Sequence, residues 1–274
     1  MKTRVIFGVV GAIFVLLALY FFPPIVATVA MVFLSVCAAQ EFTAAVSGKH
    51  SGPLQMLSML IAAVMASVSS SMVPNQEFWV RATAFISLAV LFIFLLKNHK
   101  KYGFSDISGA FVAGVVLPYL LMSLIRILNM PSGSVYILLP LLAAWGSDTC
   151  ALFAGMAFGK HKLAPEVSPK KTIEGSIGGV IGAVVLSLIY AVGVHFVCDY
   201  SLSTILLQYT VLGFFGSILG QIGDLSFSVV KRGSGIKDYG RIFPGHGGVL
   251  DRFDSVIFVA PAIELLIHAF ILVG

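Results

Sequence analysis

Charged residues are scarce in this chain. Asp, Glu, Lys and Arg make up 11% of its 274 residues, whereas 58% are hydrophobic; an average soluble domain carries about 25% charged residues. So few charges cannot cover a soluble fold, which excludes an ordinary cytosolic enzyme and a disordered protein. The apolar runs are continuous and do not alternate every second residue, which disfavours a β-barrel. The composition predicts an all-α, polytopic integral membrane protein.

Cysteine is also scarce. The three cysteines, Cys37, Cys150 and Cys198, lie in or at the ends of apolar segments, and none forms a CxxC pair. Their number and spacing exclude a disulfide-stapled secreted domain and offer no zinc site.

Nine apolar segments are present, and about 20 apolar residues span a bilayer. They lie at about 5–22, 24–46, 54–73, 78–97, 104–128, 135–158, 175–198, 203–224 and 253–273. All but two of the 17 Lys and Arg residues, Arg81 and Arg126, fall in the N-terminus and alternate loops on one side. By the positive-inside rule, the N-terminus is predicted to be cytoplasmic and the C-terminus outside.

The two halves of the chain differ in their polar content. Residues 1–130 have short loops and are predicted to be a lipid-facing scaffold of transmembrane helices. Residues 131–274 are predicted to be the catalytic region, with cytoplasmic loops at 159–174 and 225–252. Its helices contain three GxxxG pairs: Gly175/Gly179, Gly178/Gly182 and Gly216/Gly220. We interpret these pairs as sites of close helix packing; close approach to a ligand is the alternative.

Asp148 lies inside the apolar segment 135–158. A carboxylate at membrane depth costs several kcal/mol unless it is paired or hydrated, so a functional role is favoured over packing alone. The loop that follows offers cations and hydroxyls: Lys160, Lys162, Ser168, Lys170, Lys171 and Thr172. Pro169 and Thr172 are placed to start the next helix, whose N–H groups favour an anion. The simpler alternative is a basic loop that only sets topology.

A second polar group lies at the end of segment 203–224. Asp224, Ser228 and Lys231 are spaced i, i+4 and i+7, which places them on one face of a helix. A carboxylate, a hydroxyl and an ammonium there can hold a metal ion and a phosphate. An ordinary polar contact between Asp224 and Ser228 is the alternative.

The stretch 231–255 contains the highest concentration of glycines and charged residues in the chain. Six glycines allow backbone N–H groups to approach a ligand, and four cations suit phosphates: Lys231, Arg232, Lys237 and Arg241. His246 lies between glycines, where it either titrates or only donates hydrogen bonds. Asp251 and Asp254 are predicted to open the last helix, either as metal ligands for a polyphosphate or as N-terminal helix charges.

Together these features indicate metal-assisted phosphoryl or nucleotidyl transfer between a lipid and a soluble nucleotide. The signature in this stretch also resembles that of the phosphatidate cytidylyltransferases (CDP-diacylglycerol synthases). It reads Ser228-x-Val230-Lys231-Arg232-x4-Lys237-Asp238-x-Gly240-x2-Phe243-Pro244-x-His246-Gly247-Gly248-Val249-x-Asp251-Arg252-Phe253-Asp254. The upstream elements SDT (147–149), FGK (158–160), SPKKTIEG (168–175) and GDL (223–225) are similar too. Phe227 departs from the pattern, because many members have Glu before the serine.

The resemblance implies transfer of CMP from CTP to phosphatidic acid, giving CDP-diacylglycerol and pyrophosphate in phospholipid biosynthesis. It implies Mg²⁺, admits K⁺ at the same metal centre, and places the enzyme in the cell (inner, cytoplasmic) membrane with its active site facing the cytoplasm. A homodimer is expected, and no nucleic-acid partner.

Residue roles carry over by motif position. Asp224 and Asp251 are implied as metal ligands, with Asp148 and Asp254 beside them, and Lys231 and His246 complete the catalytic set; His246 is expected to orient a phosphate. The implied substrate-binding residues are Ser168, Lys170, Lys171, Thr172, Ser228, Arg232, Lys237, Gly247, Gly248, Arg252 and Ser255.

Two other functions compete with this one. Asp148 and nine spans also fit an ion-coupled membrane transporter. A CTP-dependent kinase of a polyprenol or another lipid alcohol would use similar residues but release CDP instead of pyrophosphate.

Overall fold

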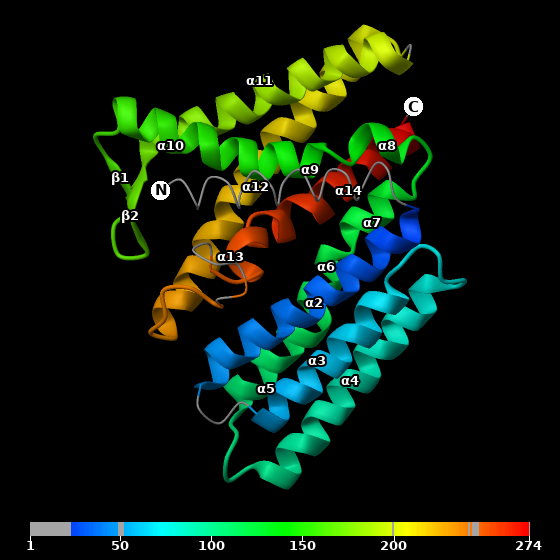
Figure 1. Ribbon diagram of the computed structural model, residues 1–274, viewed down its shortest axis with the longest axis vertical. Helices are drawn as coiled ribbons and strands as arrows, with labels where there is room; N and C mark the ends of the chain where they lie inside the picture. The colour runs from blue at the N-terminus through cyan, green and yellow to red at the C-terminus, as the bar shows by residue number, and fades with distance from the viewer. Residues whose placement is uncertain (1–22, 49–51, 199, 241, 243–246, 274) are drawn as a thin grey trace. The chain divides into compact units, whose positions relative to one another are not determined.

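The computed structural model describes residues 23–48, 52–198, 200–240, 242 and 247–273 (Figure 1). The predicted segment at 5–22, Arg241 and His246 lie outside these residues. The chain divides into two compact units. One contains Met1–Asn129 and Val230–Phe253, and the other contains Met130–Val229 and Asp254–Gly274. The stretch that contains most of the signature therefore groups with the N-terminal half of the chain.

Six helical stretches of the described residues are long and apolar enough to cross a membrane: Pro24–Ser47, Gln76–Asn98, Phe104–Leu128, Gly133–Phe158, Ile173–Cys198 and Leu202–Gly233. Two shorter apolar helices cover Gly52–Val68 and Val256–Phe270. Each of these stretches overlaps a predicted apolar segment, which confirms the helical membrane class. The total of nine spans and the orientation of the termini stay predictions.

The first unit is built on a helical bundle that begins with α2 (Pro24–Ser47), α3 (Gly52–Val68) and α4 (Gln76–Asn98). The next apolar segment is interrupted. It comprises α5 (Phe104–Phe111), the π-helical turn η2 (Val112–Val116), α6 (Leu117–Leu121) and α7 (Ser123–Leu128). Helix α2 packs against α3 and α5. A shared core joins α3, α4, α5 and η2 and includes Leu54, Ile61, Met65, Leu91, Ile107 and Val115.

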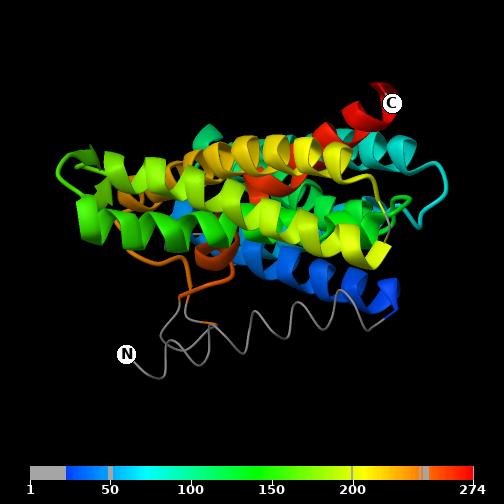
Figure 2. The same ribbon diagram turned by 90° about the horizontal axis from the view of Figure 1, so that it is seen from above.

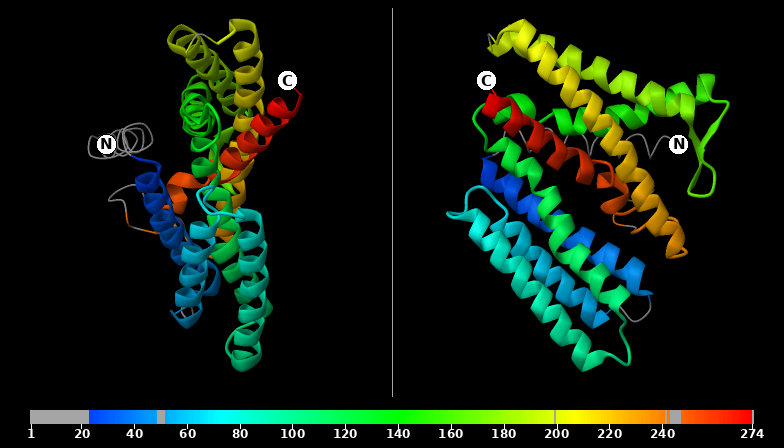
Figure 3. Two further views of the ribbon diagram at one scale, coloured as in Figure 1. Left: turned by 90° about the vertical axis from the view of Figure 1, so that its right-hand side faces the viewer. Right: turned by 180° about the vertical axis from the view of Figure 1, so that it is seen from behind.

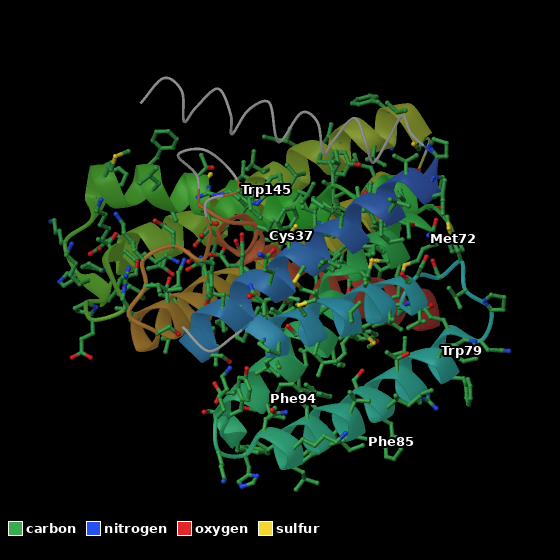
Figure 4. All side chains as sticks on the ribbon, turned by 60° about the horizontal axis from the view of Figure 1, so that its bottom comes forward. Cys37, Met72, Trp79, Phe85, Phe94 and Trp145 are labelled. Carbon is green, nitrogen blue, oxygen red and sulfur yellow. The ribbon has the colours of Figure 1, made fainter. Side chains whose placement is uncertain are left out.

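Close approach in this bundle depends on two glycines. A Cβ at Gly109 of α5 would lie 2.8 Å from Val46 Cγ1 of α2, and one at Gly114 of η2 would lie 2.9 Å from Ile61 Cγ2 of α3. The outer face of α4 is apolar and exposed, with Phe85 73% and Trp79 49% accessible (Figure 4). Such a face suits lipid, because water would not solvate it.

The second unit begins with a broken helical path. It comprises α8 (Gly133–Tyr136), α9 (Leu139–Leu141), the π-helical turn η3 (Leu142–Gly146) and α10 (Ser147–Phe158). Pro140 lies in α9 and cannot donate a backbone hydrogen bond. Helices α11 (Ile173–Cys198), α12 (Leu202–Gly233) and α14 (Val256–Val273) follow. Helix α12 contributes its last turn to the first unit.

The polar loop 159–174 contains the one β-sheet among the described residues. Strands β1 (Lys162–Ala164) and β2 (Ser168–Thr172) pair antiparallel, with Lys162 opposite Thr172 and Ala164 opposite Ser168. The hairpin projects beyond the ends of α10 and α11 (Figure 3). Pro169 lies in β2, so its predicted place at a helix start is wrong. Thr172 does cap α11, because its Oγ1 accepts the Gly175 N–H at 3.1 Å.

Helices α10 and α11 lie side by side along their length (Figure 2). A Cβ at Gly178 would overlap Ala154 Cβ, and one at Gly182 would overlap Cys150 Cβ. Cβ atoms at Gly216 and Gly220 of α12 would each come within 2.9 Å of a neighbouring side chain, Ala143 and Val259. Contact between helices therefore confirms the packing interpretation of the GxxxG pairs.

Helix α12 continues nine residues past the apolar part that ends at 224 and reaches Gly233, since no glycine or proline interrupts 224–232. The prediction that Asp224, Ser228 and Lys231 belong to one helix is confirmed, and the predicted loop 225–252 begins as helix. The predicted start of the last helix is wrong. At the other end, Asp251 and Asp254 do not open one helix. Asp251 belongs to the short helix α13 (Leu250–Phe253), and Asp254 lies in a turn before α14. The Asp254 carboxylate accepts the Ser255 N–H at 2.9 Å, which favours that turn.

Candidate active site

In the first unit, Lys231 and Asp251 form a buried ion pair. Lys231 Nζ donates to Asp251 Oδ1 at 3.0 Å, and the two side chains are only 11% and 4% exposed. The ammonium also lies 5.5 Å from the centroid of the Tyr239 ring, within reach of a cation–π contact. Buried charges need such partners, because an unpaired one would be strongly destabilising.

The other oxygen of Asp251 holds the loop backbone. Oδ2 accepts the N–H groups of Tyr239 at 2.8 Å and Gly248 at 2.9 Å. Gly247 has φ +85°, and a Cβ there would lie 2.6 Å from the same oxygen. Asp251 therefore joins the two ends of the glycine loop, and Gly247 cannot be replaced without strain.

The same loop contacts a residue that the sequence analysis missed. Glu41 of α2 is 5% exposed. Its Oε1 accepts the Val249 N–H at 3.0 Å, and its Oε2 accepts the Leu250 N–H at 2.9 Å. The signal was available, because Glu41 is a carboxylate inside an apolar segment, as Asp148 is.

In the second unit, Asp224 is paired across elements. Its Oδ2 forms an ion pair with Lys171 Nζ of β2, and its Oδ1 accepts Ser228 Oγ at 3.4 Å. The Lys171 and Asp224 side chains are 27% and 21% exposed, so this pair remains accessible. The predicted contact between Asp224 and Ser228 on one helix face is present. Lys170, the preceding residue of β2, is exposed.

Asp148, Asp254 and Ser255 form a second group in this unit. Ser255 Oγ donates to Asp148 Oδ2 at 3.2 Å and lies 3.4 Å from Asp254 Oδ1. Asp254 and Ser255 are 7% and 1% exposed. A hydroxyl has one proton, so Ser255 donates to only one of the two carboxylates at a time. Asp148, a half-buried carboxylate in an apolar helical stretch, is thus hydrogen-bonded to Ser255.

The four predicted metal ligands, Asp148, Asp224, Asp251 and Asp254, suit Mg²⁺ only in part. Among the described residues, no three His, Cys, Asp or Glu side chains gather closely enough to hold a metal. Mg²⁺ usually takes one or two carboxylates and completes its shell with waters and substrate phosphates. The carboxylates of Asp148 and Asp254, both next to Ser255, fit that requirement, and the accessible Asp224 offers another oxygen donor. Asp251 is already engaged by a lysine and two backbone N–H groups.

The remaining predicted residues lie at several places. In the first unit, Arg232, Lys237 and Arg252 are exposed, and Arg232 Nη1 donates to the Ile236 carbonyl at 3.3 Å. In the second unit, Ser168 lies on β2 and is half-buried. Phe227 replaces the Glu of many members, and it packs edge-on against Phe258 with ring centroids 6.4 Å apart. An apolar contact therefore occupies that position.

Comparison with known proteins agrees with these motifs. The cytidylyltransferase family profile matches residues 2–270. Phosphatidate cytidylyltransferase from Bacillus subtilis is 36% identical over 186 residues, 68% of this chain and 66% of the relative. The enzyme of the same name from Staphylococcus haemolyticus is 50% identical over 133 residues, 48% of each chain. The matched regions thus span about half to two thirds of these relatives' lengths. The chain belongs to the cytidylyltransferase family.

Proposed function

We propose that this protein transfers CMP from CTP to phosphatidic acid and releases pyrophosphate. We infer the two substrates from the name of the relatives, phosphatidate cytidylyltransferase. The observation that carries the proposal is the glycine loop that Asp251 of the buried Lys231–Asp251 pair holds by hydrogen bonds, with the exposed cation Lys237 in the loop and Arg232 and Arg252 in the helices at its two ends. Glycines and exposed cations are what a triphosphate needs for close backbone approach and charge neutralisation.

In the proposed reaction, a phosphate oxygen of phosphatidic acid attacks the α-phosphorus of CTP. The bond from this phosphorus to the oxygen that bridges the α- and β-phosphates breaks, and pyrophosphate leaves with that oxygen. The nucleophile is already an anion, so no general base is required. The barrier is repulsion between phosphates and their alignment, which fixed cations lower.

Each predicted residue receives a proposed role. Lys170, Lys171, Arg232, Lys237 and Arg252 neutralise phosphate charge, and Lys231 holds the Asp251 carboxylate in an ion pair. The hydroxyls of Ser168 and Thr172 donate hydrogen bonds to substrate phosphates, whereas those of Ser228 and Ser255 donate to the Asp224 and Asp148 carboxylates. Asp148 and Asp254, which both lie next to Ser255, would hold Mg²⁺, while Asp224 and Asp251 are metal ligands by the resemblance alone. When bound, Mg²⁺ neutralises and orients the triphosphate. The roles of His246, of K⁺ and of a homodimer rest on the resemblance alone.

The proposal also includes an orientation. CTP is a cytoplasmic nucleotide, and the basic residues cluster in alternate loops. We therefore place the N-terminus and the hairpin on the cytoplasmic side of the cell membrane, with the C-terminus outside.

The test is to incubate purified protein with labelled CTP, Mg²⁺ and phosphatidic acid and to identify the products. The proposal expects pyrophosphate and a lipid that carries CMP. Release of CDP would instead support the lipid-alcohol kinase, and no consumption of CTP would support the transporter. A parallel incubation with a polyprenol in place of phosphatidic acid controls for the acceptor.

A further inference from the structure

Glu41 is a buried carboxylate to which the reaction above assigns no role. It lies on α2, more than 200 positions before the loop that it contacts, and both of its oxygens accept backbone N–H groups of that loop. Only 5% of the residue is exposed. Its side chain is thus engaged by the protein itself, and a direct contact with a substrate is not its role.

The two donors are placed immediately before Asp251. Val249 ends the loop, and Leu250 opens the four-residue helix α13, in which Asp251 is the second residue. The first N–H groups of a helix have no partner within the helix. Glu41 supplies that partner from α2, so it determines where α13 begins and from where the Asp251 carboxylate projects.

The loop is shaped around the Glu41 carboxylate. A Cβ at Gly240 or at Gly248 would overlap Glu41 Oε1, so both glycines leave room for it. The next residue of α2, Phe42, stacks on Tyr239 with ring centroids 6.2 Å apart and an interplanar angle of 20°. Two consecutive residues of α2 therefore contact both ends of the loop that Asp251 closes through Tyr239 and Gly248.

The arrangement requires a carboxylate. A glutamine has the same shape, but its amide nitrogen is a donor and cannot accept an N–H. Replacing Glu41 by Gln would leave one of the two backbone N–H groups facing another donor. A buried donor without an acceptor costs about 1–3 kcal/mol.

We propose that Glu41 is a positioning residue for CMP transfer: it anchors the loop from Tyr239 to Leu250 and so orients Asp251 and the loop backbone toward CTP and Mg²⁺. This inference rests on the proposed function. Glu41 acts through the loop backbone and does not touch the reacting atoms.

The test compares Glu41→Gln with the wild-type protein in two measurements. The first is amide hydrogen exchange of 247–250, which should become about tenfold faster, the equivalent of one lost hydrogen bond. The second is the rate of CMP transfer as Mg²⁺ is titrated. Loss of a partner that orients a metal ligand typically costs about 10- to 100-fold in metal affinity or activity, and a shift of this size is expected. The KM for phosphatidic acid should not change.

Thr43→Val is the matched control. Thr43 lies on the same helix, is fully buried and shares a 2.8 Å hydrogen bond with Ser58. Its loss should lower the unfolding temperature while leaving the Mg²⁺ dependence unchanged. Glu41→Asp, which keeps two acceptor oxygens, should recover part of the lost rate. Gly240→Ala keeps Glu41 but displaces its carboxylate, and it should give the same shift if Glu41→Gln does not fold.

The outcomes separate the anchor from the proposed function. Unchanged exchange of 247–250 in Glu41→Gln, or a Mg²⁺ dependence that Thr43→Val alters equally, would overturn the positioning role. If the wild-type protein transfers no CMP, the proposed function and the positioning role both fall, whereas the exchange data still show whether Glu41 anchors the loop.

Discussion

At the scale of single residues, the Lys231–Asp251 pair is the most consequential contact in the first unit. Its side chains are almost fully buried, and Asp251 also accepts two backbone N–H groups. A buried pair stabilises little in net terms, but removing one partner leaves a buried charge uncompensated. Replacing either residue should therefore destabilise both the ion pair and the loop that Asp251 holds.

Replacing Lys231 by Met should destabilise the protein by about 3–5 kcal/mol, because the buried Asp251 carboxylate loses its cation. Thermal unfolding of detergent-purified protein measures this loss. The control is Arg81→Met, which breaks the Arg81–Glu77 pair, whose side chains are 78% and 84% exposed. That pair should contribute at most about 1 kcal/mol. Equal effects of the two substitutions would contradict a buried, coupled pair.

The candidate residues could be predicted from the sequence, but their pairings could not. Asp224 and Ser228 follow from helical spacing, and their contact is local. The Lys231–Asp251 and Lys171–Asp224 pairs depend on how a loop and a hairpin close, which composition does not determine. The role of Glu41 could not be predicted, because its contacts lie more than 200 positions away and depend on how the loop packs against α2.

At the scale of elements, the contact between α10 and α11 depends on small residues. Gly178 faces Ala154, and Gly182 faces Cys150, so α11 places no side chain of its own between the two backbones at these positions. The hairpin β1–β2 connects these helices and carries Lys171 to Asp224. The separation of α10 from α11 therefore affects where the hairpin presents that lysine.

Gly178→Ala should destabilise the second unit by about 1–3 kcal/mol, since the added methyl group has no room beside Ala154. Gly193→Ala on the same helix meets no atom within 4 Å and should be neutral or slightly stabilising. Thermal unfolding distinguishes them. The double variant Ala154→Gly with Gly178→Ala moves the methyl group from one helix to the other and should restore stability. A double variant as unstable as Gly178→Ala alone would argue against this contact.

The presence of helices could be predicted well, and their interruptions could not. Long apolar runs predict helices directly, but the π-helical turns η2 and η3 arise from packing inside otherwise apolar sequence. The hairpin lies in a lysine-rich stretch with a proline, where strand propensity is weak. Helix α12 extends past its apolar part because its polar end still has helical spacing, with Lys231 and Asp224 on one face.

At the scale of the whole molecule, the chain does not divide where its polar content changes. The segment Val230–Phe253 groups with the N-terminal half, joined to it by the contacts of Glu41 and Phe42. The region 1–130, which its short loops predict to be only a scaffold, thus holds the signature loop through Glu41 and Phe42 of α2. Hydropathy identifies membrane helices but carries no information about which of them a distant loop contacts.

We propose above that this member of the cytidylyltransferase family moves CMP, and not a terminal phosphate, onto a lipid phosphate. The most direct measurement incubates the protein, Mg²⁺ and phosphatidic acid with CTP labelled either at the α-phosphate or at the γ-phosphate. We expect label in the lipid only from the α-phosphate, with one pyrophosphate released for each lipid formed. Label in the lipid from the γ-phosphate, with release of CDP, would contradict it.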